Sequence, residues 1–93
     1  MAQFMVRVEL HGADEDDYET LHEAMESEGF ARQVSSDDGV LYHLPTAEYY
    51  REGDLSKQVV MDDAKSAAAK TKKKAGILVT KADGFRWYGL KKV

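Results

Sequence analysis

The chain opens with an alternation of apolar and polar residues, and this pattern limits the available folds more than any other feature. Within residues 3–11 the apolar side chains fall on every second position, at Phe4, Val6, Val8 and Leu10. A period of two residues is typical of a β-strand with one buried face. Residues 14–29 follow with apolar side chains at the 3.6-residue spacing of an amphipathic helix, ending at Gly29. The sequence therefore predicts a sheet covered by helices.

The middle of the chain is predicted to form a hairpin. Residues 30–36 and 40–44 have strand character, and Asp37-Asp38-Gly39 between them is a turn signal. Pro45 ends the second of these strands. Residues 46–53 are polar with two tyrosines and are predicted to form a loop.

A second strand–helix pattern completes the chain. The predicted elements are a helix over residues 54–70 with Asp54 and Ser56 as candidate N-caps, a fourth strand over residues 75–80, a two-residue turn at Asp83-Gly84 and a fifth strand over residues 85–90 that pairs back on the fourth. The order β-α-β-β-α-β-β predicts the α+β class: a ferredoxin-like βαββαβ sandwich with an extra C-terminal strand and both helices on one face of an antiparallel sheet.

Length and composition set the remaining limits. The 93 residues suffice for one domain, residues 1–93. The absence of cysteine excludes disulfides and thiolate catalysis. No segment has the roughly 20 apolar residues that a membrane span requires, and the N-terminus has no secretory pattern. We expect a cytoplasmic protein with no metal and no cofactor.

Charge is divided unevenly along the chain. Residues 1–54 carry 14 acidic and three basic side chains, whereas residues 55–93 carry three acidic and ten basic ones. Such asymmetry indicates either a polyanion-binding surface or self-association, and it also arises when each helix has a solvated face of one sign.

The outer face of the sheet is expected to be incompletely covered. If the apolar residues of the first strand face the helices, Met5, Arg7, Glu9 and His11 face away, and some apolar side chains of other strands join them. Because small proteins seldom leave such a patch bare, we predict a homodimer.

Two groups of residues are candidate sites. His43 and Arg7 on the sheet face, with Glu9, are candidates for acid–base chemistry on an RNA 2′-hydroxyl. Lysines and aromatic residues near the C-terminus are candidates for RNA binding: Lys72, Lys73, Lys74, Arg86 and Tyr88. His22 borders the apolar helix face and is interpreted as structural.

Several segments resemble the antitoxin endoribonucleases of type V toxin–antitoxin systems, the GhoS-like family. The segments are Phe4-Met5-Val6-Arg7-Val8-Glu9-Leu10, Asp17-Tyr18-Glu19-Thr20-Leu21-His22-Glu23-Ala24-Met25, Gly29-Phe30 and Tyr42-His43-Leu44-Pro45. The resemblance implies a ferredoxin-like fold and sequence-selective cleavage of a toxin messenger RNA. Related nuclease folds use an aspartate near the end of the first strand, where this chain has Glu9, His11 and Asp14.

Two functions follow as hypotheses. The first is a small RNA-binding regulator that resembles an antitoxin endoribonuclease and cleaves, if at all, without a metal. The second is a non-catalytic dimeric protein-interaction module. The basic C-terminal part favours the first, and the acidic net charge of −4 favours the second.

Overall fold

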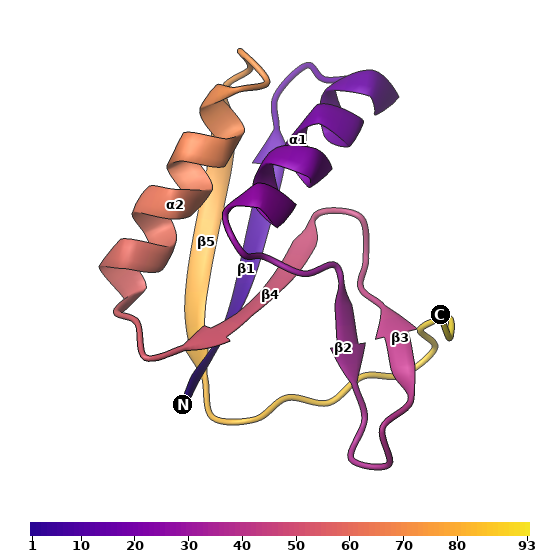
Figure 1. The fold of residues 1–93 in the computed structure, drawn as a ribbon. Coiled ribbons are helices and arrows are strands. Elements are labelled where there is room, and N and C mark those ends of the chain that lie inside the picture. The colour runs from indigo at the N-terminus through magenta and orange to yellow at the C-terminus, as the bar shows by residue number, and fades with distance from the viewer.

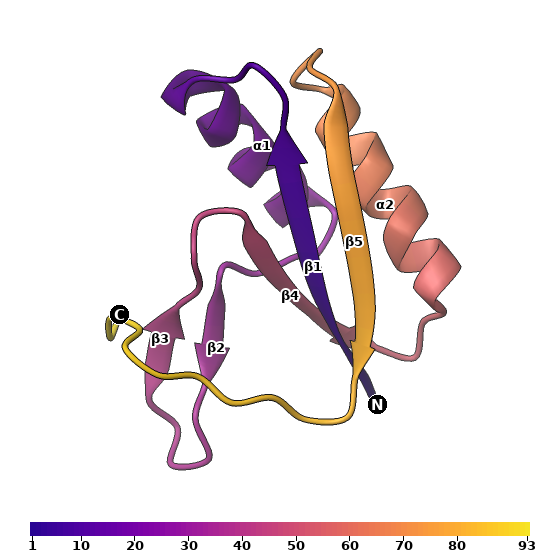
Figure 2. The same cartoon turned by 180° about the vertical axis from the view of Figure 1, so that it is seen from behind.

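The computed structural model describes residues 1–93 as an α+β protein with two helices on one face of an antiparallel sheet (Figure 1). The elements are β1 (Ala2–Leu10), α1 (Glu15–Ser27), β2 (Gln33–Ser35), β3 (Leu41–His43), β4 (Glu48–Gly53), α2 (Lys57–Ala69) and β5 (Ala75–Ala82). Seen from behind, the sheet lies in front of both helices, and the short β2–β3 hairpin stands to one side (Figure 2). The predicted two-layer arrangement is confirmed, but the strands form two sheets instead of one.

β1 is the central strand of the larger sheet, whose order is β4-β1-β5. It runs antiparallel to both neighbours: Val6 lies opposite Tyr49 of β4 and Val79 of β5. The apolar side chains of β1 are buried against the helices, whereas Arg7 and Glu9 are exposed on the outer face. The two faces predicted from the alternation of this strand are therefore confirmed.

The helices begin and end where local chemistry favours it. Asp14 caps α1 in a capping box with Asp17, and the backbone N–H of Asp17 lowers the pKa of the Asp14 carboxyl. Gly29 follows α1 with φ +94°, a conformation that glycine adopts without strain. Ser56 caps α2 by accepting a hydrogen bond from the backbone N–H of Val59.

The core lies between the helices and the sheet. α2 contributes mainly small side chains, Ala64, Ala67 and Ala68, which let its backbone approach the sheet closely. The largest fully buried side chains come from β1, β4, α1 and α2: Tyr49, Phe4, Leu21, Met25, Val6, Val8 and Val60.

β4 corrects the sequence interpretation, which assigned residues 46–53 to a loop. Only Tyr49 of this strand is fully buried, so the segment lacks the regular apolar alternation of β1. Arg51 also faces the helices: its guanidinium lies 2.6 Å from Asp63 of α2 and over the ring of Phe30. A strand whose inner face carries a partly buried ion pair beside a tyrosine is not recognisable from its periodicity.

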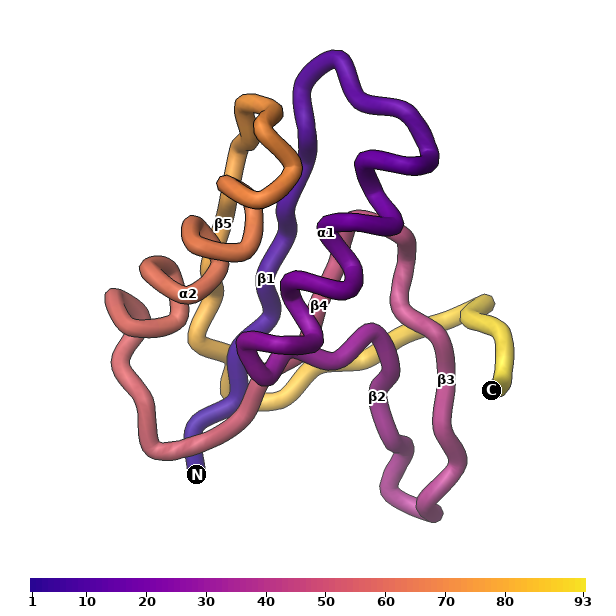
Figure 3. The backbone as a smooth tube through the Cα atoms, turned by 45° about the horizontal axis from the view of Figure 1, so that its top comes forward, coloured from indigo at the N-terminus to yellow at the C-terminus, as the bar shows by residue number.

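Two further corrections concern the hairpin and the C-terminus. Residues 30–36 and 40–44 contribute only the short strands β2 and β3, and β3 is not part of the larger sheet. A single bridge, Ala31 to Tyr50, links this region to β4. The predicted fifth strand does not form: residues 83–93, here called the C-terminal strap, leave β5 and cross to β3 without pairing with β5 (Figure 3).

The strap ends on the hairpin. The backbone N–H of His43 donates to the carbonyl of Lys91, and that of Val93 donates to the carbonyl of Leu41. β5 consequently has a partner strand on one side only. None of the helices is long and apolar enough to cross a membrane.

Candidate functional site

The C-terminal strap places a row of aromatic side chains along the outer side of the molecule. Phe85 lies 5.7 Å from Tyr50 of β4, measured between ring centroids, and 5.8 Å from Trp87. Trp87 in turn lies 5.5 Å from Tyr42 of β3. Tilted rings at these separations attract one another, so this aromatic row holds the strap between the larger sheet and the hairpin.

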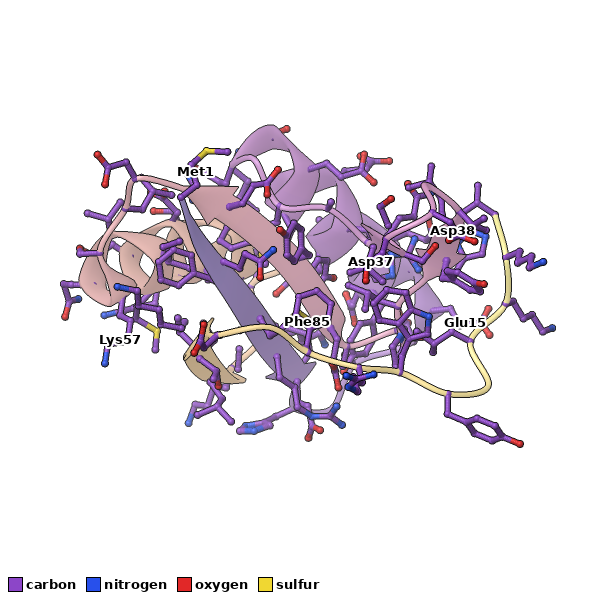
Figure 4. The ribbon with its side chains drawn as sticks, turned by 90° about the horizontal axis from the view of Figure 1, so that it is seen from below. Met1, Glu15, Asp37, Asp38, Lys57 and Phe85 are labelled. Carbon is purple, nitrogen blue, oxygen red and sulfur yellow. The ribbon has the colours of Figure 1, made fainter.

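An open cavity of about 450 Å³ adjoins this row. Its aromatic walls are Tyr42, Phe85 and Trp87, and its polar lining comes from the strap, β1 and the hairpin: Arg86, Gly84, Gln3, Ser35, Ser36 and Asp37. Figure 4 views the molecule from this end and shows Phe85 on the strap, with Asp37 and Asp38 on the neighbouring hairpin. The cavity thus combines ring faces with hydrogen-bonding groups and one guanidinium.

Cationic and aromatic side chains of the strap also reach solvent. Tyr88 is fully exposed, and Arg86 is exposed and makes no ion pair. Lys91 and Lys92 are exposed at the end of the strap beside β3. The predicted RNA-binding residues Arg86 and Tyr88 therefore lie on one short segment, next to the cavity.

Arg7 and Glu9 are joined on the outer face of the sheet. The Arg7 guanidinium lies 2.7 Å from Glu9 and 3.0 Å from Glu48 of β4. Hydrogen bonding and the charge of Glu9, with a smaller effect of Glu48, raise the pKa of Arg7 above its usual value. Two carboxylates thus occupy the donors of this arginine, and the group as a whole is anionic.

His43 does not share a sheet with Arg7 and Glu9, contrary to the prediction that these residues face one RNA from the central sheet. It lies at the end of β3, on the separate hairpin. Side chains alternate along a strand, so His43 points to the opposite face of β3 from Tyr42, which contacts Trp87. No histidine lines the aromatic cavity.

The predicted basic surface is divided between two ends of the molecule. Lys72, Lys73 and Lys74 lie in the connection between α2 and β5, and Arg86 follows the other end of β5 (Figure 1). Lys73 lies 3.8 Å from Asp17 of α1, so part of its charge is balanced.

The structure reveals one polar pair that the sequence interpretation did not anticipate. Nδ1 of His22 lies 2.6 Å from the hydroxyl of Tyr49, and both residues are buried. The sequence predicts a structural His22 at the border of the helix face and a loop at Tyr49. No signal in the sequence joins the two, since the assignment of β4 as a strand is needed to bring Tyr49 beneath α1.

Comparisons with known protein families and with curated proteins find no match to this chain.

Proposed function

We propose that the protein is a small regulator that binds single-stranded RNA with its C-terminal strap. The observation that carries the proposal is the aromatic row beside the open cavity, with the free Arg86 and the fully exposed Tyr88 at its edge. We include in the proposal a ferredoxin-like relationship of the fold, kinship with the GhoS-like antitoxins and a cytoplasmic location.

The chemistry of the strap fits unpaired nucleotides better than a duplex. Bases stack on aromatic rings irrespective of sequence, at roughly 1–3 kcal/mol per base, and only unpaired bases expose both ring faces. Phe85 and Trp87 are held by neighbouring rings, so little side-chain entropy is lost on stacking. Arg86 can donate to phosphate oxygens, while Gln3 and Asp37 supply an amide and a carboxylate to base edges.

The geometry favours a protein that binds RNA and does not use His43 to cleave it. The outer sheet face around Arg7 carries Glu9 and Glu48, which repel phosphate. His43 is on the separate β2–β3 sheet and does not line the aromatic cavity. The proposed catalytic group of His43, Arg7 and Glu9 is therefore divided between two sheets, and Arg7 is already held by two carboxylates.

Homodimerisation belongs to the same proposal, through the free edge of β5. The backbone N–H of His11 donates to the carbonyl of Lys74, which fixes the hydrogen-bonding pattern between β1 and β5. In this pattern Gly76 and every second residue after it form backbone hydrogen bonds to β1. Ile77 and Val79 therefore direct their backbone groups to the open edge. Lys81 is the one charged residue of this strand. A long, apolar and unpaired edge is the kind of surface that a second strand covers.

The proposal is tested through Trp87, the single tryptophan of the chain. Stacking of a base near this ring should quench its fluorescence during titration with short single-stranded RNA. Arg86→Gln should weaken binding roughly tenfold, because it removes an unpaired guanidinium beside the cavity. Arg7→Gln is the matched control: it removes an arginine already held by two carboxylates and should change the affinity less than twofold.

The salt dependence provides a second readout. Phosphate contacts make the affinity fall steeply between about 50 and 200 mM salt. Unchanged fluorescence at low salt and saturating RNA would refute the proposal. The exposed Leu78 and the free β5 edge would then favour the alternative function, a non-catalytic protein-interaction module. Equal losses for Arg86→Gln and Arg7→Gln would show that RNA binds elsewhere.

A further inference from the structure

A second cavity, on the helix side of the molecule and away from the strap, contains polar groups that lack partners. Its volume is about 570 Å³. Its lining comes from α1 and the residues just before it, the residue that precedes β2, and the loop after β3: Ala13, Asp14, Glu15, Asp16, Tyr18, Glu19, His22, Arg32 and Thr46. None of these residues belongs to the aromatic row, so this cavity is independent of the proposed RNA site.

The tautomer of His22 follows from its buried neighbour. Tyr49 is fully buried, and its hydroxyl has one hydrogen-bonding partner, Nδ1 of His22 at 2.6 Å. Burial raises the pKa of Tyr49 far above its usual value, so the phenol keeps its proton and donates it to Nδ1. Burial and the charge of Arg32 lower the pKa of His22, which is therefore neutral with its proton on Nε2.

His22 consequently directs an unused donor toward the cavity. The side chain is 5% exposed, and Nε2 has no hydrogen-bonding partner within the protein. In the free protein water can accept from this N–H, and an oxyanion that displaces the water would accept from the same donor.

Arg32 is the second unpartnered donor at the same place. Its Nε is buried without a hydrogen bond, and its guanidinium makes no ion pair despite the nearby acidic residues. Arg32 and His22 line the same cavity, so the guanidinium and the imidazole can meet one ligand there. The side chain as a whole is half-buried, and a guanidinium without a carboxylate partner beside a cavity is suited to an anionic group.

The acidic rim of the cavity determines which charge the other end of the ligand carries. Asp14 is engaged in capping α1, but Glu15, Asp16 and Glu19 are exposed and make no ion pair. These carboxylates repel a simple anion and attract an amine. The cavity therefore favours a molecule with an oxyanion at one end and positive charge at the other.

We propose that this cavity binds a free cationic amino acid, with its carboxylate on Nε2 of His22 and the guanidinium of Arg32 and its ammonium groups at the acidic rim. The carboxylate satisfies the two unpaired donors, and the ammonium groups replace the missing partners of Glu15, Asp16 and Glu19. This ligand class separates the site from the RNA-binding strap, whose ligand is a polyanion.

The test uses the full chain and three probes: L-lysine, which carries both charges, acetate, which carries only the carboxylate, and cadaverine, which carries only the amines. Long-range proton–nitrogen NMR spectra report the ring nitrogens of all three histidines. The free protein should show His22 as the neutral tautomer with the proton on Nε2. L-lysine should shift this ring at concentrations at which acetate and cadaverine do not, and the rings of His11 and His43 are internal controls.

Two variants separate binding from folding effects. Arg32→Gln should weaken L-lysine binding at least about tenfold, since a charge-assisted hydrogen-bonding partner is lost. Arg86→Gln should leave it unchanged, because Arg86 lines the other cavity. The proposal is overturned if cadaverine shifts His22 as strongly as L-lysine, if no probe shifts it at 20-fold excess over about 1 mM protein, or if the folded Arg32→Gln variant binds L-lysine as the wild type does.

Discussion

The neutral imidazole of His22 makes stability depend on pH at the scale of a single residue. Its pKa in the folded state lies below the usual value of 6.5, chiefly because burial disfavours the charged ring and because Arg32 adds positive charge. Glu19 and Glu26 oppose this shift. In the unfolded chain the ring takes up a proton near pH 6.5, so protonation favours unfolding.

We therefore expect His22 to destabilise the protein as the pH falls below 6.5 toward its lower folded pKa. The contribution is absent above pH 6.5, where the ring is neutral in both states. In urea unfolding, the loss of stability between pH 7.5 and 5.5 should be smaller for His22→Asn, whose amide oxygen can still accept from Tyr49. His43→Asn is the matched control, since His43 is exposed. Equal pH dependence in the wild type and His22→Asn would contradict this account.

Arg7 shows how far residue-level inference from sequence extends. Its proximity to Glu9 was predictable, because positions i and i+2 of a strand share a face. Glu48 was not predictable as a partner, because it lies in β4, which the sequence interpretation treated as a loop. With Glu9 and Glu48 both paired to its guanidinium, Arg7 is less suited to the predicted role at an RNA 2′-hydroxyl.

At the scale of elements, the helices and strands that the sequence predicts correctly are those with regular apolar periodicity. β1, α1, α2 and β5 all have apolar spacing that matches their structure, and each was predicted within a few residues of its bounds. These four elements hold most of the core, so the α+β class followed from them.

The elements that were mispredicted are those fixed by long-range contacts. β4 is held by the buried Tyr49 and by the ion pair of Arg51 with Asp63, neither of which produces a pattern in its own sequence. The strap has strand-like alternation at Phe85 and Trp87, but those rings contact Tyr50 and Tyr42 instead of a neighbouring strand. The arrangement of the strap, and with it the aromatic cavity, could not be predicted without knowing where these tyrosines lie.

The end of α1 provides a prediction about an element boundary. Gly29 has φ +94°, which an L-residue adopts at a cost of roughly 1–2 kcal/mol. A methyl group there would meet Arg51 only at 3.5 Å, so the cost comes from the backbone. Gly29→Ala should lower the melting temperature by roughly 5 °C or more.

Gly76→Ala is the matched control for this substitution. Gly76 lies in β5 without a positive φ, and an added methyl group would meet only His11, at 3.9 Å. The variant should be as stable as the wild type or slightly more so, because alanine restricts the unfolded chain. Equal destabilisation by both substitutions would mean that the conformation of Gly29 is not what ends α1.

At the scale of the whole molecule, the free edge of β5 predicts self-association. Leu78 is 64% exposed on the outer face of this strand. Antiparallel pairing of two β5 strands about Leu78 would place this residue opposite its copy and Lys81 opposite Ala75, without a like-charge pair. We expect the mass of two chains by light scattering at about 100 µM protein.

Leu78→Glu should give the mass of one chain, because the pairing would then oppose two carboxylates. Leu41→Glu on β3 replaces another exposed leucine away from β5 and should leave the dimer intact. A wild-type chain that is monomeric under these conditions would remove the dimer from the proposal. A dimer that survives Leu78→Glu would assign the interface to another surface.

The separation of basic side chains along the molecule predicts how binding depends on RNA length. Lys72, Lys73 and Lys74 precede β5 and Arg86 follows it, so the eight residues of this strand separate the two groups by roughly 25 Å. An RNA of about four nucleotides fits the strap alone, whereas one of about 16 nucleotides can also reach the lysines.

Replacement of all three lysines by glutamine should therefore spare the short RNA and weaken the long one. We expect the affinity for the 4-mer to change less than twofold. For the 16-mer, the slope of log affinity against log salt concentration should become shallower by up to about 2, because each phosphate contact to a single strand contributes about 0.7 to this slope. The pairing of Lys73 with Asp17 makes three full contacts an upper limit. Equal weakening of both RNAs would place the primary site at the lysines, and the strap would then bind through its aromatic rings to something other than RNA. If the binding of neither RNA changes, the three lysines only form a solvated surface, and the strap alone binds the RNA.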